Sequence, residues 1–197
     1  LILKTSLEHF FQEPPATTQP KYQEGFGPLP AAFDYVTYGD LAELESKMND
    51  KVSAVMLETI QGEGGIYVPP AGYLQKVRAL CDKYNAVLIL DEIQCGMGRT
   101  GYMYCWQKYG VKPDIMTTAK ALGGGVPVGA FLMTKKVADN SLVAGDHGTT
   151  YGGNPLAGAA ITEVFKLYEE LGICDNAKNV GEYLYSELEK VDETPAE

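Results

Sequence analysis

The chain has 197 residues, of which 45% are hydrophobic and 21% charged, and its formal net charge is -10 at pH 7. This length and composition suit one α/β domain with a sizeable core, and the negative charge argues against nucleic acids and anionic membranes as partners. No apolar run reaches membrane-spanning length, and the apolar residues 1–3 are too few for the core of a signal peptide.

Residues 1–32 contain several prolines and lack a regular apolar period, so we interpret them as a loop-rich N-terminal segment. Asp40 then suits the N-cap of a helix, because apolar residues follow it at helical spacing. Residues 53–57 are predicted to form a buried strand, and Glu58 stands at its end.

A glycine-rich turn and a helix lead from this strand to the next one. The turn occupies residues 61–65, where the glycines permit positive φ or close backbone approach. Residues 70–84 carry their apolar side chains on one helical face, and Asn85 suits the helix end. Residues 87–90 are a continuous apolar run, the pattern of a strand buried in a parallel sheet, and the run stops at Asp91.

A second short strand, at residues 114–118, ends in the same way just before Lys120. The carboxyl ends of neighbouring parallel strands meet at one edge of the sheet, where open α/β sheets bind their ligands. We therefore expect the carboxylate of Asp91 and the amine of Lys120 to face one crevice. An acid and an amine delivered in this way are what a pyridoxal phosphate enzyme needs.

The chemistry of that cofactor gives each side chain a role. The amine of Lys120 can form a Schiff base with the cofactor aldehyde and afterwards carry a proton. The carboxylate of Asp91 can keep the pyridine nitrogen protonated, which makes the ring an electron sink. The side-chain amide of Gln94 can hydrogen-bond the phenolic oxygen. The alternative is structural, with Asp91 capping the following element and Lys120 a solvated helix residue.

Beyond the lysine, a glycine turn leads to a predicted strand at residues 128–134, and Lys135 begins a short helix. Residues 147–154 form a polar, glycine-rich loop whose hydroxyls and backbone amides can donate to phosphate oxygens, unless it is an ordinary capping loop. Asn154 suits the cap of a helix that runs to about residue 171. A second helix follows, and we expect both helices to cover the sheet.

Four successive segments resemble the motifs of one protein family. They are LETIQGEGG (57–65), LILDEIQCGMGRTG (88–101), DIMTTAKALGGGVPVGA (114–130) and HGTTYGGNPLAGAA (147–160). Their order and spacing resemble those of the class III, fold-type I pyridoxal phosphate aminotransferases. The residues in these segments are most similar to those of the acetylornithine and ornithine aminotransferases within that family.

The resemblance implies an α/β fold in which helices cover both faces of a mostly parallel central sheet. It divides the chain into the N-terminal segment (1–32), the core of the large cofactor-binding domain (33–172) and a helix that leads toward a C-terminal small domain (173–197). Members of the family are considerably longer, so the small domain is largely missing from this chain.

The resemblance also implies which residues hold the cofactor, pyridoxal 5'-phosphate. Lys120 matches the position of the cofactor lysine. The rest of the implied cofactor-binding set around the first strand tip consists of Asp91, Glu92, Ile93 and Gln94.

Further residues are implied to contact substrate or the neighbouring subunit. Thr150 reaches the phosphate of the cofactor bound to the other subunit, so the family's active sites are shared within a homodimer. Thr149 lies near the substrate, and the place of Glu58 at the end of its strand puts it at the same crevice. Glu63 pairs with an arginine that otherwise binds the substrate α-carboxylate, which lets one site accept both an ω-amino donor and a dicarboxylate. That arginine lies outside this chain.

The activity implied by the resemblance is transfer of the terminal amino group of N-acetylornithine or ornithine to 2-oxoglutarate. The products are a semialdehyde and glutamate, and the pathway belongs to arginine or related amino-acid metabolism.

Two alternatives remain open from the sequence. Residues 96–101 match G-x-G-x-x-G, the loop of nicotinamide-dependent dehydrogenases, but these glycines do not directly follow the strand tip. Residues 102–110 also predict only a short helix, not the long one that would hold a pyrophosphate. The other alternative is a non-catalytic or inactive fragment of a pyridoxal phosphate domain, since the parts that stack on the ring lie outside this chain.

The four cysteines are Cys81, Cys95, Cys105 and Cys174, without a C-x-x-C spacing and with only two histidines in the chain. This pattern does not favour a metal site. Free thiols in a reducing cytoplasm are the preferred interpretation.

Overall fold

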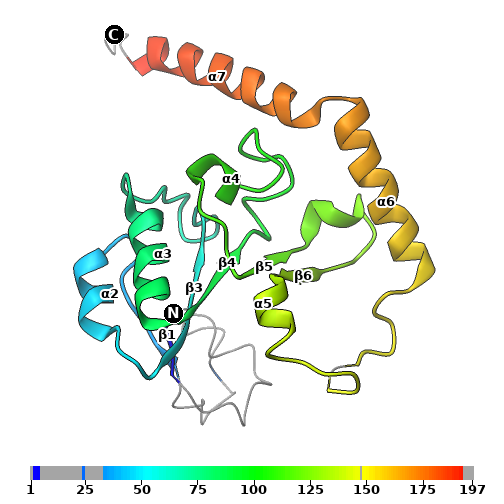
Figure 1. The fold of residues 1–197 in the computed structure, drawn as a ribbon. Coiled ribbons are helices and arrows are strands. Elements are labelled where there is room, and N and C mark those ends of the chain that lie inside the picture. The colour runs from blue at the N-terminus through cyan, green and yellow to red at the C-terminus, as the bar shows by residue number, and fades with distance from the viewer. Residues whose placement is uncertain (1, 5–23, 25–32, 147, 193–197) are drawn as a thin grey trace.

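The computed structural model describes residues 2–4, 24, 33–146 and 148–192, and their strands form one mixed sheet (Figure 1). In spatial order the strands are β2 (Phe33–Asp34), β1 (Ile2–Lys4), β3 (Val52–Glu58), β4 (Val87–Asp91), β5 (Ile115–Thr118) and β6 (Ala130–Met133). Strands β3, β4 and β5 are parallel, whereas β1 and β6 pair with this centre in the antiparallel sense. The predicted α/β fold with a parallel centre is thereby confirmed. Most of the 1–32 segment lies outside the described residues.

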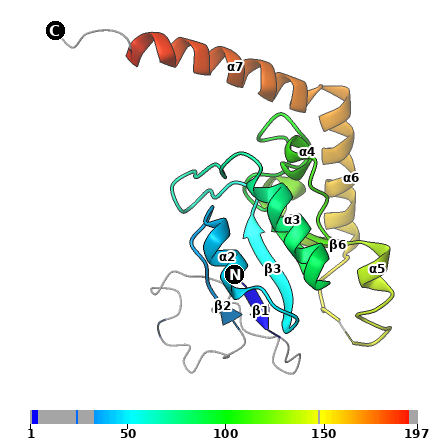
Figure 2. The same cartoon turned by 60° about the vertical axis from the view of Figure 1, so that its left-hand side comes forward.

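Two helices, α2 (Leu41–Lys47) and α3 (Tyr73–Tyr84), lie side by side over one face of β3 and β4 (Figure 2). The fully buried or nearly buried side chains between them and the sheet include Leu44, Leu74, Val77, Cys81, Val55, Leu88 and Leu90. Burial of each large aliphatic side chain stabilises the fold by about 1.5–3 kcal/mol. Packing of this layer therefore holds β3 and β4, the strands that end in Glu58 and Asp91, in place.

The ends of α2 and α3 form as their sequences predict. The Oδ1 atom of Asp40 accepts a hydrogen bond from the backbone N–H of Glu43 at 2.9 Å and so caps α2. Asn85 ends α3 with a left-handed φ of 52°. Local side-chain chemistry is enough to set these boundaries.

One carboxylate fixes the sheet at the end opposite the strand tips. The Oδ2 atom of Asp114 accepts hydrogen bonds from the backbone N–H of Leu88 at 2.9 Å and from Nη1 of Arg78 at 2.7 Å. Arg78 also forms an ion pair with Asp82, one turn further along α3. Strands β4 and β5 and helix α3 are thus tied together at this end.

The connection from β5 to β6 is short, which explains why β6 is antiparallel. It contains only the 3-10 turn η3 (Lys120–Gly123) and a glycine-rich stretch, whereas a parallel strand needs a longer crossover. Helix α5 (Lys135–Ala138) follows β6 directly, as predicted. Helix α4 (Trp106–Tyr109) is the short helix expected before β5.

Helices α6 (Pro155–Glu170) and α7 (Ile173–Asp192) meet at an elbow (Figure 1). The Oδ1 atom of Asn154 accepts from the backbone N–H of Ala157 at 2.9 Å, which confirms the predicted cap of α6. Helix α6 packs beside η3, but α7 turns back from the elbow and runs above α4, off the sheet, in both views. The expectation that both helices cover the sheet is therefore wrong for α7. None of the helices in the described ranges combines the length with the apolar composition that a membrane span requires.

Candidate active site

Three predicted strand ends meet at one edge of the sheet. Glu58 of β3 is the register partner of Asp91 of β4, which in turn pairs with Thr117 of β5. Register partners in a sheet project to the same face. Because the neighbouring residues Leu88 and Leu90 project to the face under α3, the Glu58, Asp91 and Thr117 side chains lie on the other face.

Asp91 is half-buried at the end of β4. Its Oδ1 atom accepts a hydrogen bond from the backbone N–H of Ile93 at 2.8 Å, so the capping role considered for this residue does occur. Its Oδ2 atom accepts no hydrogen bond in the described part of the chain. One carboxylate oxygen therefore stabilises the turn, while the other is available to a ligand.

Lys120 lies next to this turn, as the sequence predicts. Its Nζ atom donates a hydrogen bond to Oε1 of Gln94 at 3.0 Å, and the lysine side chain is exposed. Lys120 opens η3 with a φ of 52°, in the left-handed region that few non-glycine residues adopt. Such backbone strain is frequent at functional sites.

The turn at residues 61–65 packs against Gln94. A Cβ atom added at Gly62 would lie 2.3 Å from Cδ of Gln94, so only glycine fits there without movement. The Oε2 atom of Glu58 accepts a hydrogen bond from the backbone N–H of Gly62 at 3.0 Å and holds this turn at the strand tip. Glu63, at the same turn, is exposed.

Glu92 differs from its neighbours because its side chain is completely buried, away from solvent. Its carboxylate accepts hydrogen bonds from the hydroxyl of Thr59 and from the backbone N–H groups of Cys105 and Trp106. Burial raises the pKa of Glu92, and these hydrogen bonds oppose the rise. A cofactor contact for Glu92 stays a prediction, and its occupied carboxylate does not support it. Ile93 is half-buried.

Thr149 and Thr150 are not brought to the strand tips. Both are exposed in the connection between α5 and α6, which runs away from the sheet in Figure 1. Their predicted contacts with substrate and with the phosphate of a neighbouring subunit stay predictions. His147 in the same loop lies outside the described residues.

The glycine-rich segment 96–101 is a series of turns wedged against α6 and α7. A Cβ atom at Gly98 would lie 2.8 Å from the ring of Tyr168, and one at Gly101 would lie 2.8 Å from Cβ of Lys178. The hydroxyl of Tyr168 donates to the carbonyl of Met97 at 2.9 Å. The segment that follows contains only the four-residue α4, so it lacks the long helix of a dinucleotide-binding loop.

Sequence reasoning missed Thr59, Thr117 and Tyr38. The Oγ1 atom of Thr117 is buried beside the strand tip and has no hydrogen-bond partner in the described ranges. The hydroxyl of Tyr38 lies within hydrogen-bonding distance of the carbonyls of Glu58 and Thr59, and burial raises its pKa. Thr59 lies two residues beyond the predicted strand 53–57, and Thr117 is the last residue but one of the predicted strand 114–118, which was the available signal for them.

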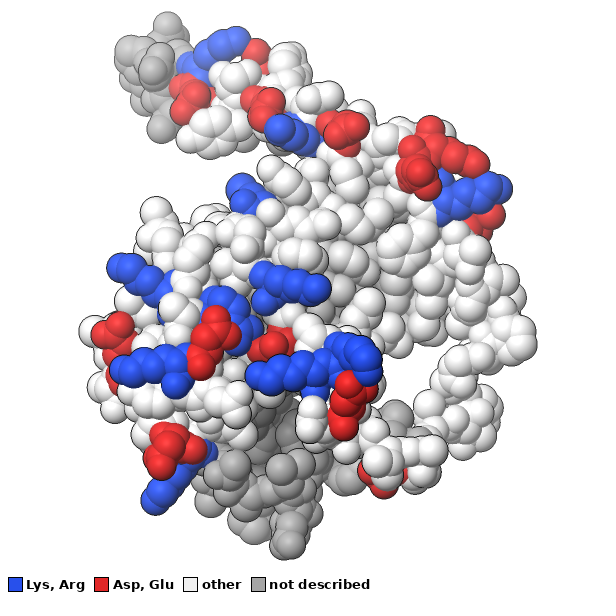
Figure 3. All heavy atoms as spheres, in the orientation of Figure 1, with Lys and Arg blue, Asp and Glu red and all other residues white. Residues whose placement is uncertain are grey.

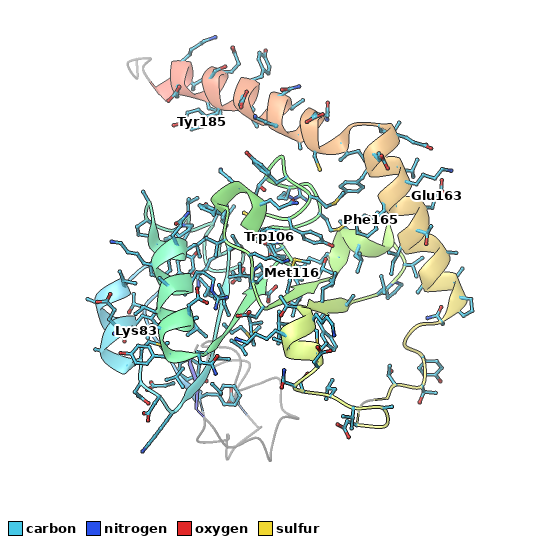
Figure 4. All side chains as sticks on the ribbon, in the orientation of Figure 1. Lys83, Trp106, Met116, Glu163, Phe165 and Tyr185 are labelled. Atoms are coloured by element: carbon cyan, nitrogen blue, oxygen red, sulfur yellow. The ribbon has the colours of Figure 1, made fainter. Side chains whose placement is uncertain are left out.

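Two surface hollows lie away from the strand tips. One, of about 640 Å³, is at the elbow of α6 and α7 beside Phe165, which is labelled in Figure 4. The other, of about 490 Å³, is beside Arg78 at the opposite end of the sheet.

Basic and acidic side chains are interspersed on the face in Figure 3. The described cysteines are all free thiols, and burial raises the pKa of Cys81 to about 12.

Comparisons with known proteins agree on one family. The family model described as aminotransferase class-III matches residues 15–197. The acetylornithine aminotransferase of Methanocaldococcus jannaschii is 52% identical over 176 residues, which are 89% of this chain and 44% of that protein. The acetylornithine/succinyldiaminopimelate aminotransferase of Yersinia pestis is 56% identical over 139 residues, or 71% of this chain and 34% of that protein.

Solved structures give the same result. The ornithine aminotransferase of Toxoplasma gondii, which has partial occupancy of PLP at its active site, superposes with a TM-score of 0.82 at 36% identity, covering 88% of this chain and 41% of its own. The acetylornithine aminotransferase of Elizabethkingia anophelis superposes with a TM-score of 0.78 at 35% identity, covering 83% and 44% respectively. The chain thus spans less than half the length of these relatives.

Proposed function

This chain belongs to the class III aminotransferases, and from that membership we propose that the protein containing it transfers the terminal amino group of N-acetylornithine or ornithine to 2-oxoglutarate. The products are the corresponding semialdehyde and glutamate, and the reaction serves arginine or related amino-acid metabolism. The names of the relatives, at about half of all residues identical, support this choice of donor.

Class III aminotransferases depend on pyridoxal phosphate, and the chemistry of the residues at the strand tips fits that cofactor. Lys120 offers an exposed amine for the aldehyde, Asp91 a carboxylate oxygen for the pyridine nitrogen, and Gln94 an amide for the phenolic oxygen. The unpartnered hydroxyl of Thr117 lies in the same place. When bound, the cofactor supplies an electron-poor ring that accepts the electron pair left by the departing proton.

The observation that carries the proposal is the 3.0 Å hydrogen bond between Nζ of Lys120 and Oε1 of Gln94, which belongs to the turn that Asp91 begins. In our proposal, Nζ of Lys120 moves a proton to and from the substrate carbon that bears the amino group. Asp91 keeps a negative charge at the ring nitrogen. Ile93 presents an apolar side chain from the same turn.

Substrate selection is proposed for the turn that leaves β3. Glu63 is exposed at this turn and can pair with a cationic side chain from outside the chain. Release of that pair lets the cation bind the carboxylate of 2-oxoglutarate. Glu58 shapes the turn through its hydrogen bond to Gly62. The contact of Thr149 with substrate is proposed from the family resemblance, since the structure leaves this residue exposed in the connection between α5 and α6.

We further propose a homodimer with shared active sites, in which Thr150 donates to the cofactor phosphate of the other subunit. The surrounding loop supports this, because Tyr151 is 83% exposed and Leu156 is 73% exposed. No Lys, Arg, Asp or Glu occurs between Asp146 and Glu163. Exposed apolar and aromatic side chains without charges are typical of an interface core.

The proposed organisation follows the family. Residues 33–172 form the core of the large domain, residues 1–32 lead into it, and residues 173–197 lead toward a small domain. The location proposed is the cytoplasm. We expect residues 1–197 alone to transfer little or no amino group, and substantial turnover by this stretch would overturn that part of the proposal.

The test is a panel of amino donors with 2-oxoglutarate, using the complete protein loaded with pyridoxal phosphate. Glutamate formation is measured with N-acetylornithine, ornithine, succinylornithine, 4-aminobutyrate and lysine. We expect the highest kcat/KM with N-acetylornithine or ornithine. A clear preference for another donor would overturn the donor assignment, and the absence of transfer from every donor would overturn the activity.

A further inference from the structure

The carboxylate of Glu92 is the centre of a buried hydrogen-bond cluster. Its Oε1 atom accepts from the hydroxyl of Thr59 at 2.6 Å and from the backbone N–H of Trp106 at 2.8 Å. Its Oε2 atom accepts from the backbone N–H of Cys105 at 2.7 Å and from the thiol of Cys95 at 3.6 Å. Four donors therefore converge on one side chain that has no exposed surface.

These donors come from separate segments of the chain. Thr59 follows β3, Cys95 belongs to the turn after β4, and Cys105 and Trp106 lie at the start of α4, where Figure 4 labels Trp106. Hydrogen bonds to a charged acceptor are about twice as strong as neutral ones. One carboxylate thus joins three loops.

The turn at residues 91–96 has one side buried in the protein and another side directed toward Lys120. Glu92 and Cys95 are buried, whereas Asp91 and Gln94 are half-buried and lie toward Lys120 and the strand tips. The backbone closes the turn tightly, because the N–H of Gly96 donates to the carbonyl of Glu92 at 3.0 Å. A Cβ atom at Gly96 would lie 2.5 Å from that carbonyl oxygen.

The rest of the turn is also held by its buried face. The backbone N–H of Glu92 donates to the carbonyl of Thr117 at 3.0 Å, and the thiol of Cys95 lies 3.6 Å from the carbonyl of Asp91. A rotation of the turn would therefore move Asp91 and Gln94 together. Anchoring the buried face fixes the orientation of both outward side chains.

We propose that Glu92 is a positioning residue, whose buried carboxylate sets where Asp91 and Gln94 meet the cofactor without touching it. The inference rests on the proposed function, since it concerns the same cofactor site. It replaces the direct cofactor contact expected for Glu92 from the sequence with an action through its neighbours.

The test compares Glu92→Gln with Asp114→Asn in the complete protein. Both changes neutralise a carboxylate that ties several elements of the same sheet, but Asp114 lies at the end away from the site. Three quantities are measured: the melting temperature of the cofactor-free protein, the Kd for pyridoxal phosphate, and the pH midpoint of the absorbance of the bound cofactor.

In Glu92→Gln, the amide N–H group of the glutamine faces backbone N–H groups that hydrogen-bond the carboxylate in the wild type, so at least one hydrogen bond is lost. The free energy of one hydrogen bond corresponds to a roughly tenfold change in affinity. We therefore expect the Kd to rise roughly tenfold and the pH midpoint to shift. For Asp114→Asn we expect a lower melting temperature with Kd and midpoint unchanged. Thr59→Ser should keep wild-type values, and Thr59→Val should change them in the same direction as Glu92→Gln.

A purely structural role predicts a different pattern. If Glu92→Gln lowers the melting temperature but leaves the Kd and the pH midpoint at wild-type values, the positioning role is overturned. If that variant does not fold, Thr59→Val decides by the same two readouts. A wild-type protein that binds no pyridoxal phosphate would instead overturn the proposed function, and the positioning role with it.

Discussion

The amine of Lys120 and the side-chain amide of Gln94 are 3.0 Å apart, although they follow different strands and are separated by 26 residues in sequence. The parallel pairing of β4 with β5 brings the two strand ends together, and the short turns that follow them complete the approach.

Lys120→Ala should abolish amino transfer and the absorbance band of the lysine-bound cofactor in the complete protein, because the amine proposed to condense with the cofactor aldehyde is removed. Lys135→Ala is the matched control. Lys135 is exposed on α5 and pairs with Asp139 at 2.6 Å, so its removal should leave both readouts unchanged. Retention of the absorbance band by the Lys120 variant would refute the assignment.

Asp91→Asn should lower kcat by about a hundredfold or more, since the charge opposite the ring nitrogen is lost. The fold should remain, because an asparagine oxygen can still accept the hydrogen bond from the backbone N–H of Ile93. Steady-state kinetics and thermal melting together test this. A variant with wild-type kcat would argue that Asp91 serves only as the cap of the turn.

Gly62→Ala should weaken cofactor binding by displacing Gln94, because the new methyl group would lie 2.3 Å from its Cδ atom. Gly181→Ala serves as the control, as a Cβ atom there meets nothing within 4 Å. That change should stabilise α7 by about 0.5–1 kcal/mol. Cofactor titration of both variants measures the difference, and equal affinities would contradict the predicted contact.

The pH dependence of stability should reveal the buried Glu92. Burial raises its folded pKa above the ordinary value of 4.5, so the folded protein holds this proton more tightly than the unfolded chain does. The resulting stability is fully present below the unfolded pKa and is lost as pH rises through the folded value. Relative to Glu92→Gln, wild-type protein should therefore lose unfolding free energy as the pH rises through this window.

Urea unfolding of the cofactor-free proteins at a series of pH values measures this difference. If the gap between the two proteins does not change with pH, or grows in favour of the wild type, the direction given for this pKa is incorrect.

Mixing Lys120→Ala subunits with Thr150→Ala subunits should restore activity if the active sites are shared. Each mixed dimer would contain one site with an intact lysine and an intact threonine, so random mixing should recover roughly a quarter of wild-type activity. The unmixed variants provide the baselines. Activity equal to the mean of the two baselines would argue against a shared site.

The sequence was sufficient to predict those elements whose boundaries depend on neighbouring residues in the chain. The caps at Asp40, Asn85 and Asn154 depend on side chains next to the helix end, and all three occur as predicted. The apolar runs of β3 and β4 likewise mark their strands, because a buried parallel strand needs few polar residues.

The sequence was insufficient where partners are distant. Glu92 follows Asp91 directly, and only its hydrogen bonds to Thr59, Cys105 and Trp106 show that its carboxylate lies on the buried side of the turn. The apolar stripe of α7 indicated an amphipathic helix but not what it contacts. The position of Thr117 beside Asp91 depends on strand register, which residue patterns do not specify.

Helix α7 has 20 residues and is therefore about 30 Å long. Its second turn packs so closely on the loop of residues 96–101 that a methyl group at Gly101 would lie 2.8 Å from Cβ of Lys178. That loop begins two residues after Gln94 in the chain. A displacement of the C-terminal end of α7 would consequently also move the turn that faces Lys120.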